Sequence, residues 1–526
     1  MNLLKAIATV GGFTLLSRVF GFLRDILIAN YLGAGMVADA FVVAFRFPNL
    51  FRRLFAEGAF AAAFVPLFSR ELEGDDAEAA RVRAGEFADQ ALSVLALVLV
   101  LFVTAMELVM PWAMEVLAGG FRAVPGKMEL ATELSRISFP YLLFISIVSL
   151  QSGVLNSVGR FAAAAAAPVL LNLTLIAALL GFADRMATPG HALSWGVFAA
   201  GVVQAAWLAR HCRKAGFPLR FVRPRWTDKV ALLVKRILPV VFGASLYQIN
   251  LLIGTILATW VSDGAVSYLY YADRVTQLPL GVVGIAVGTA LLPLLSRQLK
   301  AGHEDAAMNC QNRGIEVALL LTLPAAAAFL VIPGPIIGVL FRHGAFDAAA
   351  AHATAQALFA YATGLPAYVL IRVLSPGFYA REDTTTPVRI AIWAMAVNIA
   401  LNLILMRVLA HVGIALAASI SAWVNVVLLG AVLVRRGHLT FDERLKSRGP
   451  RILLSTLGMV GVLEIARQNL VGLLAGGTVE RIGALIALIA AGLIAFVVFA
   501  VLLRAAGLQD AKSLLKARDL DGGKPE

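Results

Sequence analysis

Charged residues, cysteines and catalytic motifs are all scarce in this sequence of 526 residues. Charged side chains make up 15% of it, whereas a typical soluble protein has roughly 25%. Two cysteines, Cys212 and Cys310, are too few and too separated for a disulfide framework, and the seven histidines show no metal-ligand spacing. No Walker loop, nucleophile elbow or zinc-protease helix occurs. We therefore predict no enzyme, no metal site and no bound cofactor.

Apolar residues dominate what is present. The sequence is 60% hydrophobic, with a mean hydropathy of +0.83. Apolar runs of about 20 residues recur along the chain, the length that crosses a hydrocarbon layer of ~30 Å. Outer-membrane barrels have short alternating segments instead. The sequence therefore predicts an all-α integral membrane protein with about 14 transmembrane helices. The predicted spans are 8–33, 37–63, 87–112, 131–155, 161–182, 191–210, 230–260, 266–295, 313–333, 352–378, 386–409, 412–434, 452–473 and 482–503.

The positive charge is concentrated in the connections between spans. The net charge is +13, but the most polar connections, 69–86, 210–229, 296–313 and 435–451, all fall on one side of the membrane if fourteen spans are right. Lys and Arg accumulate on the cytoplasmic side of membrane proteins. We therefore predict a multi-pass protein of the bacterial inner membrane with both termini in the cytoplasm, and no binding to nucleic acid.

An internal repeat divides most of the chain into two halves. PLFSR at 66–70 matches PLLSR at 293–297, and Pro140 occupies the place in span four that Pro366 occupies in span ten. Six spans per copy is an even number, so both copies enter the membrane in the same direction. We predict two parallel six-helix lobes around a central cavity, plus two extra C-terminal helices. The predicted regions are an N-terminal lobe (1–210), a basic cytoplasmic linker (211–229), a C-terminal lobe (230–436), two helices forming a lipid-tail groove (437–504) and a cytoplasmic tail (505–526).

Several arginines lie inside predicted spans. An arginine in the middle of a membrane costs about 2.5–3.5 kcal/mol on insertion scales, so some of them are expected to line a water-filled cavity. Guanidinium groups match the oxygens of phosphate, which favours a diphosphate or similar polyanion as substrate. The alternative is that they reach the membrane surface or pair with acids. The arginines are Arg18, Arg24, Arg46, Arg52, Arg53 and Arg274, and the acids are Asp25, Asp39, Glu57 and Asp273.

Helical geometry limits how these side chains combine. Arg18 and Arg24 are about 120° apart around a regular helix, so they share a cavity only if it wraps the helix or if Gly21 permits a bend. Asn398 and Asn402 are one turn apart and face the same way. They form a candidate polar site for a cation or for substrate hydroxyls, although such amides more often bond between helices.

Four segments resemble one known family. FRFPNLFRRLFAEGAFAAAFVP at 45–66, YYADRVTQLPLGVVGIAVGTALLP at 270–293, SRVFGFLRD at 17–25 and DTTTPV at 383–388 are similar to the lipid II flippase family, MurJ (formerly MviN). That family belongs to the multidrug, oligosaccharidyl-lipid and polysaccharide (MOP) exporter superfamily. The resemblance covers essentially the whole chain, and it implies fourteen spans and the transport of undecaprenyl-diphosphate-linked disaccharide-pentapeptide to the periplasmic leaflet for peptidoglycan synthesis.

The resemblance also implies roles for individual residues. Motif matching places the family's diphosphate-binding arginines on Arg18, Arg24, Arg52 and Arg274. The gate and cavity positions fall on Asp39, Arg53, Glu57, Ser267 and Asp273. Gln277 stands where many relatives have an acid, and Gly254, Asn398 and Asn402 offer no carboxylate where some relatives place a cation site. Coupling by a membrane potential or by an ion is therefore left open, and no motif encodes the oligomeric state.

The resulting hypothesis is alternating access between two lobes. The polar head group of lipid II would enter a cationic cavity while its tail stays among membrane lipids, along spans thirteen and fourteen. The alternatives are an exporter of another lipid-linked oligosaccharide or a cation-coupled multidrug antiporter; the latter predicts a cavity of acids and aromatics. A membrane-bound transferase would need a reactive motif in a sizeable loop. A purely structural scaffold protein is distinguished by whether charge-preserving changes at Arg24 are tolerated.

Overall fold

The computed structural model describes residues 3–52 and 59–505. Within these ranges the chain forms helices and turns and no strand. Nine helical segments of the described chain are long and apolar enough to cross a membrane. The predicted class, an all-α integral membrane protein, is confirmed, whereas the number of fourteen spans stays a prediction. The chain divides into two compact units, Met1–Ser267 with His343–Ala350 (unit 1) and Tyr268–Arg342 with Ala351–Glu526 (unit 2).

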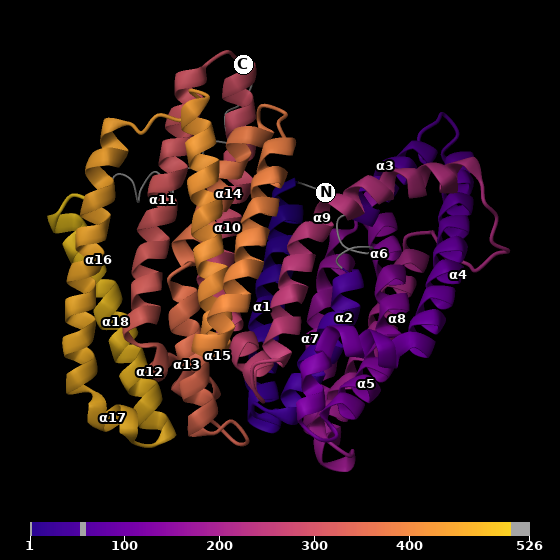
Figure 1. Ribbon diagram of the computed structural model, residues 1–526. Helices are drawn as coiled ribbons and strands as arrows, with labels where there is room; N and C mark the ends of the chain where they lie inside the picture. Colours follow the sequence, from indigo (N-terminus) through magenta and orange to yellow (C-terminus); the bar gives the residue numbers. More distant parts are fainter. Residues whose placement is uncertain (1–2, 53–58, 506–526) are drawn as a thin grey trace. The chain divides into compact units, whose positions relative to one another are not determined.

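Unit 1 contains the first nine helices (Figure 1). Helix α7 packs on both α1 and α8, α6 packs on α8, and α2 packs on α5. A Cβ atom added to Gly196 of α8 would lie 2.8 Å from the Cβ of Ala178 in α7. Small residues of this kind allow helix backbones to approach closely in a membrane. The helices are α1 (Leu3–Leu32), α2 (Met36–Phe51), α3 (Ala59–Glu71), α4 (Ala77–Ala118), α5 (Lys127–Ser138), α6 (Tyr141–Ser157), α7 (Phe161–Phe182), α8 (Pro189–Lys214) and α9 (Asp228–Thr259).

Unit 2 contains the remaining helices, and α10 starts at the end of unit 1. Helix α11 packs on α14 and α16, and α16 packs on α18. Buried side chains of α11 and α14, such as Ile315 and Val373, belong to one hydrophobic cluster. The helices are α10 (Ala265–Lys300), α11 (Glu304–Val331), α12 (Pro333–Phe341), α13 (Ala348–Ala362), α14 (Leu365–Tyr379), α15 (Thr385–Arg435), α16 (Glu443–Asn469), α17 (Val471–Ala475) and α18 (Thr478–Leu502).

Helix breaks occur at the repeated prolines. Predicted span 131–155 is divided between α5 and α6 at Pro140, and predicted span 352–378 is divided between α13 and α14 just before Pro366. Proline removes a backbone donor and clashes with the preceding turn, which explains a break at equivalent places in both copies. Predicted spans 386–409 and 412–434 both lie in α15, which is interrupted by the non-helical backbone of Ala410 (φ 50°, ψ −132°). The prediction of two lobes at 1–210 and 230–436 stays a prediction; in the compact units, α9 belongs with unit 1.

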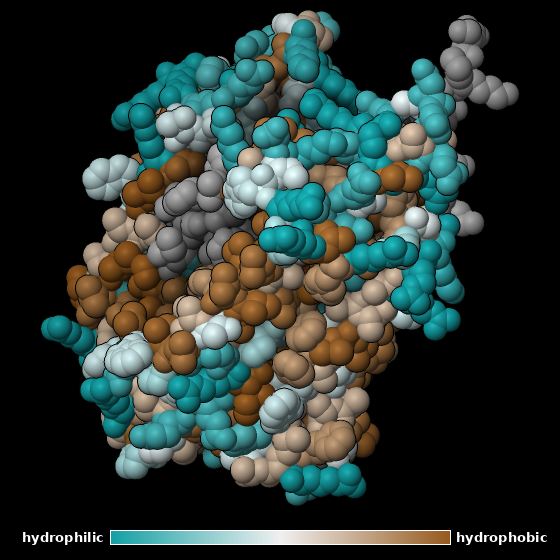
Figure 2. Space-filling model, turned by 90° about the vertical axis from the view of Figure 1, so that its right-hand side faces the viewer, coloured by the Kyte–Doolittle hydropathy of each residue, from teal (hydrophilic) through white to brown (hydrophobic). Residues whose placement is uncertain are grey.

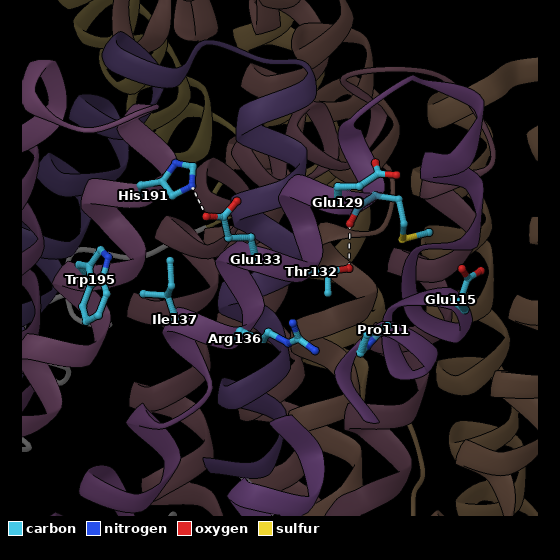
Figure 3. Close-up of a pocket in the computed structure, with 10 residues that line it drawn as sticks. Pro111, Glu115, Glu129, Thr132, Glu133, Arg136, Ile137, His191 and Trp195 are labelled. Carbon is cyan, nitrogen blue, oxygen red and sulfur yellow. Dashed lines mark hydrogen bonds and ion pairs between the residues drawn. The ribbon is translucent and has the colours of Figure 1, made fainter. Parts of the chain in front are cut away.

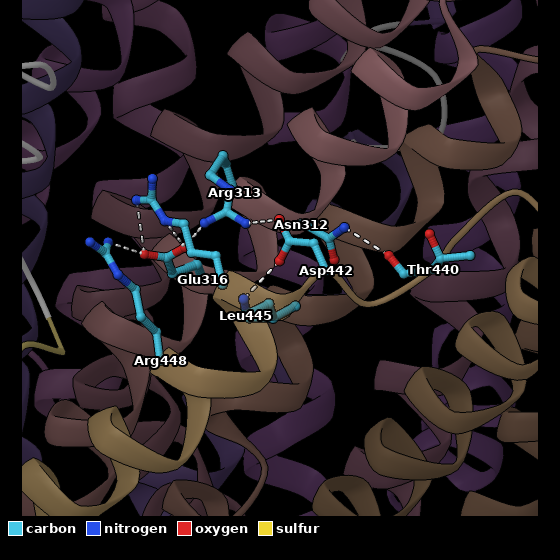
Figure 4. A network of polar contacts seen from close by, with 8 residues as sticks. Asn312, Arg313, Glu316, Thr440, Asp442, Leu445 and Arg448 are labelled. Carbon is cyan, nitrogen blue, oxygen red and sulfur yellow. Dashed lines mark hydrogen bonds and ion pairs between the residues drawn. The ribbon is translucent and has the colours of Figure 1, made fainter.

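A buried acid joins α11 to α16 in unit 2 (Figure 4). The Glu316 carboxylate accepts hydrogen bonds from Arg448 at 2.6 Å and from Arg444 at 3.2 Å, and it also pairs with Arg313. Arg313 pairs in addition with Asp442, which caps the start of α16 by accepting from the Leu445 amide at 2.7 Å. One carboxylate of low exposure thus binds guanidinium groups from two helices, and this fixes the start of α16 beside α11.

The outer face formed around α4 has the surface expected of a protein in a bilayer. Figure 2 shows apolar side chains gathered across the middle of this face and hydrophilic side chains above and below them. On α4, Leu101, Leu108 and Trp112 are 62–70% exposed. Apolar side chains of this size are exposed together only where lipid or a partner covers them. The middle of α4 therefore faces hydrocarbon.

Candidate functional site

Asp39 lies at the centre of a buried polar network in unit 1. Helix α2 starts after Gly35, and Asp39 lies in its first turn, where an acid is favoured by the helix dipole. The side chain is completely buried. Its Oδ1 accepts from the amide of Ser267 at 2.8 Å and from its hydroxyl at 2.5 Å, and its Oδ2 accepts from the amide of Gly264 at 2.8 Å. Two of the predicted gate and cavity residues, Asp39 and Ser267, are thus in direct contact.

Lys127 completes this network and was not predicted as a site residue. Its side chain is 1% exposed, and its Nζ lies 2.7 Å from Asp39 and 2.5 Å from Asp263, which is about half exposed. The ammonium also lies 4.3 Å from the centroid of the Phe121 ring. No motif marks Lys127 in the sequence, because the predicted span begins only at 131 and the partner Asp39 lies 88 residues away.

Arg24 is buried against α7. Its Nε and Nη2 donate to Oδ1 of Asp25 at 3.0 and 2.7 Å, and its Nη1 donates to Oδ1 of Asn172 at 2.9 Å. Asn172 in turn donates to the backbone carbonyl of Ser17 at 2.9 Å, which fixes the orientation of its amide. The ring of Phe45 lies 5.8 Å from the guanidinium carbon. This guanidinium is therefore held both by Asp25, as in the alternative that the arginines pair with acids, and by Asn172, which was not predicted.

The other arginines of unit 1 occupy different environments. Arg18 is exposed on α1, in contrast to buried Arg24, as their angular separation predicts. Arg52 follows the last residue of α2, and its Nε donates to Oδ1 of Asn49 at 2.9 Å. Arg46 is half-buried and donates to the hydroxyl of Thr255 in α9. Arg53 and Glu57 lie outside the described residues.

The predicted site residues of unit 2 lie on α10 and α15. The Arg274 guanidinium lies 4.7 Å from the centroid of the Tyr270 ring, one turn earlier. Asp273 accepts a hydrogen bond from the side chain of Gln277, one turn later in α10. Asn402 donates to Asn398 at 3.0 Å, and both are buried. This bond lies within α15. The predicted convergence of Arg274 with the arginines of unit 1 stays a prediction.

A surface hollow of about 780 Å³ lies among α4, α5 and α8 of unit 1 (Figure 3). Glu115, Glu129 and Glu133 line it beside Arg136, and His191 lies 3.3 Å from Glu133. Three carboxylates oppose one guanidinium, so the charge of this hollow is the reverse of what a diphosphate needs. The hollow is therefore distinct in chemistry from the predicted arginine site.

The fold and these residues define a class of protein first. Long apolar helices with a buried arginine, Arg24, and a buried lysine–carboxylate network are typical of membrane transporters, in which intramembrane charge marks a substrate path. The chain is similar in structure to a lipid II flippase MurJ in an inward closed conformation, with a TM-score of 0.78 and 24% identity over 94% of this chain and 98% of that one. It is also similar to an inward-facing MATE-family transporter of the MOP superfamily, with a TM-score of 0.62 and 18% identity over 80% and 93%. The chain has the fold of a multi-helix transporter.

The sequence comparisons identify the particular family. Residues 28–472 match the family model described as lipid II flippase MurJ. A probable lipid II flippase MurJ of Rhizobium tropici is 46% identical over 482 residues, which cover 91% of this chain and 90% of that protein. The chain therefore belongs to the MurJ family, as the resemblance in its sequence implies.

Proposed function

We propose that this protein transports lipid II, the undecaprenyl-diphosphate-linked precursor of peptidoglycan, from the cytoplasmic to the periplasmic leaflet of the bacterial inner membrane. Membership of the MurJ family over residues 28–472 carries this proposal. The geometry of Arg24 supports it, because a buried guanidinium with a fixed orientation is suited to the oxygens of a diphosphate.

We assign four arginines to binding the diphosphate of lipid II. Arg18, Arg24, Arg52 and Arg274 would each contribute charge-assisted hydrogen bonds to it. Arg24 is already neutralised by Asp25 and held by Asn172 before substrate arrives. Its orientation therefore needs little reorganisation on binding, which favours affinity since fewer side-chain rotamers are lost.

The network around Asp39 is assigned to the periplasmic gate. Lys127 bridges Asp39 on α2 with Asp263 on the α9–α10 connection, and Ser267 joins the same carboxylate from α10. Such a network has discrete paired and unpaired states, as an alternating-access cycle requires. In this mechanism it closes the external side while substrate enters from the cytoplasm, and the lipid tail stays outside along α16 and α18.

The membrane potential is assigned to the return of the empty carrier. A cavity that carries several arginines moves positive charge when it reopens inward, and each full charge is worth about 2.3 kcal/mol per 100 mV. An inside-negative potential would therefore accelerate the return step. Flipping in sealed proteoliposomes should rise with an imposed inside-negative potential; a rate that does not respond to the potential contradicts this assignment and leaves lipid II transport itself intact.

Complementation tests the proposed substrate. Cells depleted of their own lipid II flippase should grow with the wild-type protein and should fail with Arg24→Ala or Arg274→Ala at matched membrane expression. Arg122→Ala is the control, because Arg122 is an exposed arginine paired with exposed Glu115. Failure of the well-expressed wild type contradicts lipid II as substrate. Growth with both cavity variants assigns these arginines to structure.

The shared transporter fold keeps two other substrates as alternatives. The structural similarity to a MATE-family transporter admits a cation-coupled drug antiporter, and the same superfamily includes exporters of other lipid-linked oligosaccharides. Buried Arg24 favours an anion over a cationic drug. Competition for binding to the purified protein separates the three, since only the lipid II assignment predicts displacement of labelled lipid II by unlabelled lipid II and not by a cationic drug or another lipid-linked glycan.

A further inference from the structure

The connection between α8 and α9 is a fixed strap along α4. Residues 217–226, the interfacial strap, have no helical or strand structure, yet their backbone is bonded to α4 side chains within unit 1. The amide of Arg220 donates to Asp89 at 2.8 Å, that of Val222 to Ser93 at 2.9 Å, and that of Arg225 to Gln90 at 3.1 Å. Figure 1 shows this connection beside α4 at the right edge of the view. These bonds determine where the side chains of the strap lie.

The strap is also anchored at its first residue. Phe217 is buried, and its ring lies 5.4 Å from that of Phe68 in α3 and 5.7 Å from the guanidinium carbon of Arg81 in α4. Arg81 donates to the carbonyl of Ala215 at 3.3 Å. Gly216 has φ +87°, a left-handed backbone conformation that glycine adopts without the strain a side chain would add. The strap is therefore a positioned element of unit 1.

The side chains that the strap exposes are aromatic and basic. Phe221 is 70% exposed and Trp226 is 65% exposed. Arg220, Arg223 and Arg225 are exposed as well, and no acidic residue occurs between 215 and 227. Aromatic rings and arginines together are typical of the interface between hydrocarbon and lipid head groups, where rings lie at the head-group level and cations attract anionic phosphates.

The depth of the strap agrees with this interface. Val222 is bonded to Ser93, and Leu97, one turn further along α4, is 47% exposed and begins the apolar surface of that helix. Four residues of α-helix rise about 6 Å. Phe221 is adjacent to Val222, so its ring starts within one helical turn of the hydrocarbon edge. Asp75 precedes the start of α4 at Ala77, which is about 24 Å from Ser93 along the helix axis.

We propose that the interfacial strap binds anionic phospholipids of the adjacent leaflet, with Phe221 and Trp226 among the head groups and the three arginines on lipid phosphates. The strap thereby holds the end of unit 1 that carries the α3–α4 connection at a fixed depth in the membrane. This role is separate from lipid II transport, because the strap contains none of the residues assigned to the diphosphate.

Photocrosslinking of the full-length protein in nanodiscs tests the proposal without any transport. Nanodiscs expose both leaflets, so the result does not depend on which side of the membrane is cytoplasmic. The probe is benzoylphenylalanine at Phe221, and the control is the same probe at Asp75, which is exposed in the same unit. In discs of phosphatidylcholine with a minor share of phosphatidylglycerol, we expect several-fold more lipid adduct at position 221 than at 75, enriched in phosphatidylglycerol beyond its share of the lipid.

Charge removal tests the arginines. Replacing Arg220, Arg223 and Arg225 by Gln keeps every backbone anchor and should abolish the enrichment in phosphatidylglycerol. Raising the salt concentration from 0.1 to 1 M shortens the Debye length from about 10 to about 3 Å. High salt should therefore abolish the enrichment in phosphatidylglycerol on the wild-type protein as well. Equal lipid adduct at 221 and 75 overturns the membrane contact, and so does a strap that crosslinks only to protein. Adduct without preference for the anionic lipid overturns the role of the arginines.

Discussion

Removing one charge from the Asp39–Lys127 pair should destabilise unit 1 far more than removing the other acid that Lys127 contacts. The ammonium lies 2.7 Å from Asp39 and 2.5 Å from Asp263, but Asp39 is fully buried whereas the Asp263 side chain is 48% exposed. Breaking a buried ion pair costs about 3–5 kcal/mol, because a buried charge is left uncompensated. An exposed pair contributes about 0–1 kcal/mol. The two distances are similar, but the predicted losses of stability on removing Asp39 or Asp263 are therefore very different.

Thermal unfolding of the purified protein in detergent measures both losses. A thiol-reactive dye reports the unfolding of unit 1 in a Cys310→Ser background, since Cys212 in α8 is buried whereas Cys310, in α11 of unit 2, is partly exposed. A loss of 3–5 kcal/mol should lower the midpoint on the order of 10 °C for Asp39→Asn, and Asp263→Asn should lower it by at most about 3 °C. Lys127→Met should lower the midpoint by about as much as Asp39→Asn does.

The double variant decides whether the effect is electrostatic. Lys127→Met combined with Asp39→Asn leaves no unpaired charge between the two positions, so its loss should be smaller than the sum of the single losses by about 1–3 kcal/mol. Additive losses, or equal midpoints for Asp39→Asn and Asp263→Asn, would refute the reasoning, because both results mean that burial does not govern the strength of this network.

Three further variants test other parts of the structure. Glu316→Gln leaves three clustered guanidinium groups without their shared carboxylate and should lower the thermal midpoint by several degrees, whereas Glu464→Gln, which breaks an exposed i,i+3 pair, should leave it within about one degree. The Thr386 hydroxyl, and after it the Arg436 guanidinium, hold the pKa of Asp383 below its ordinary value. A carboxyl group whose pKa is lowered by folding stabilises the folded state at every pH above its unfolded pKa of about 3.9, and stabilises it less below that pH. The difference in stability between wild type and Asp383→Asn should therefore have its full size at pH 6–7 and should shrink as the pH falls through 4. Gly120→Ala places a Cβ 2.2 Å from the carbonyl of Thr259 and should destabilise unit 1, whereas Gly254→Ala, which meets nothing within 4 Å in α9, should be neutral or stabilising in the same thermal assay.

The membrane class and most helix positions could be predicted because the hydrophobic signal is long and local. Each apolar run must satisfy its own backbone in lipid, so a run of about 20 residues predicts a helix with little help from tertiary contacts. Pro140 marks a place where the two copies correspond, but the predicted span 131–155 runs across it, so the break between α5 and α6 was not predicted. The junction between predicted spans at 409 and 412 fell beside Ala410, whose positive φ interrupts α15.

Polar partners from distant parts of the chain could not be predicted in the same way. The pairing of Arg24 with Asp25 is local and was among the alternatives, whereas Asn172 is separated from Arg24 by 148 residues and carries no motif. Lys127 was overlooked for the same reason, since its partner Asp39 lies 88 residues away. Helix periodicity assigns a face to each residue, but only the packing of α1 on α7 and of α2 on α5 determines which polar faces meet.

These long-range pairs explain why charge is tolerated in this fold. Arg24 and Lys127 are both nearly fully buried, yet each donates to a carboxylate and to at least one further polar or aromatic group. A buried cation with a single partner would leave donors unsatisfied, which costs more in a membrane than in water. Replacing Asn172 by Ala should therefore loosen the hold on the Arg24 guanidinium without removing its charge, and growth in the flippase-depleted strain should fall. Asn172→Asp keeps an acceptor for the guanidinium, so it should restore growth more than Asn172→Leu does.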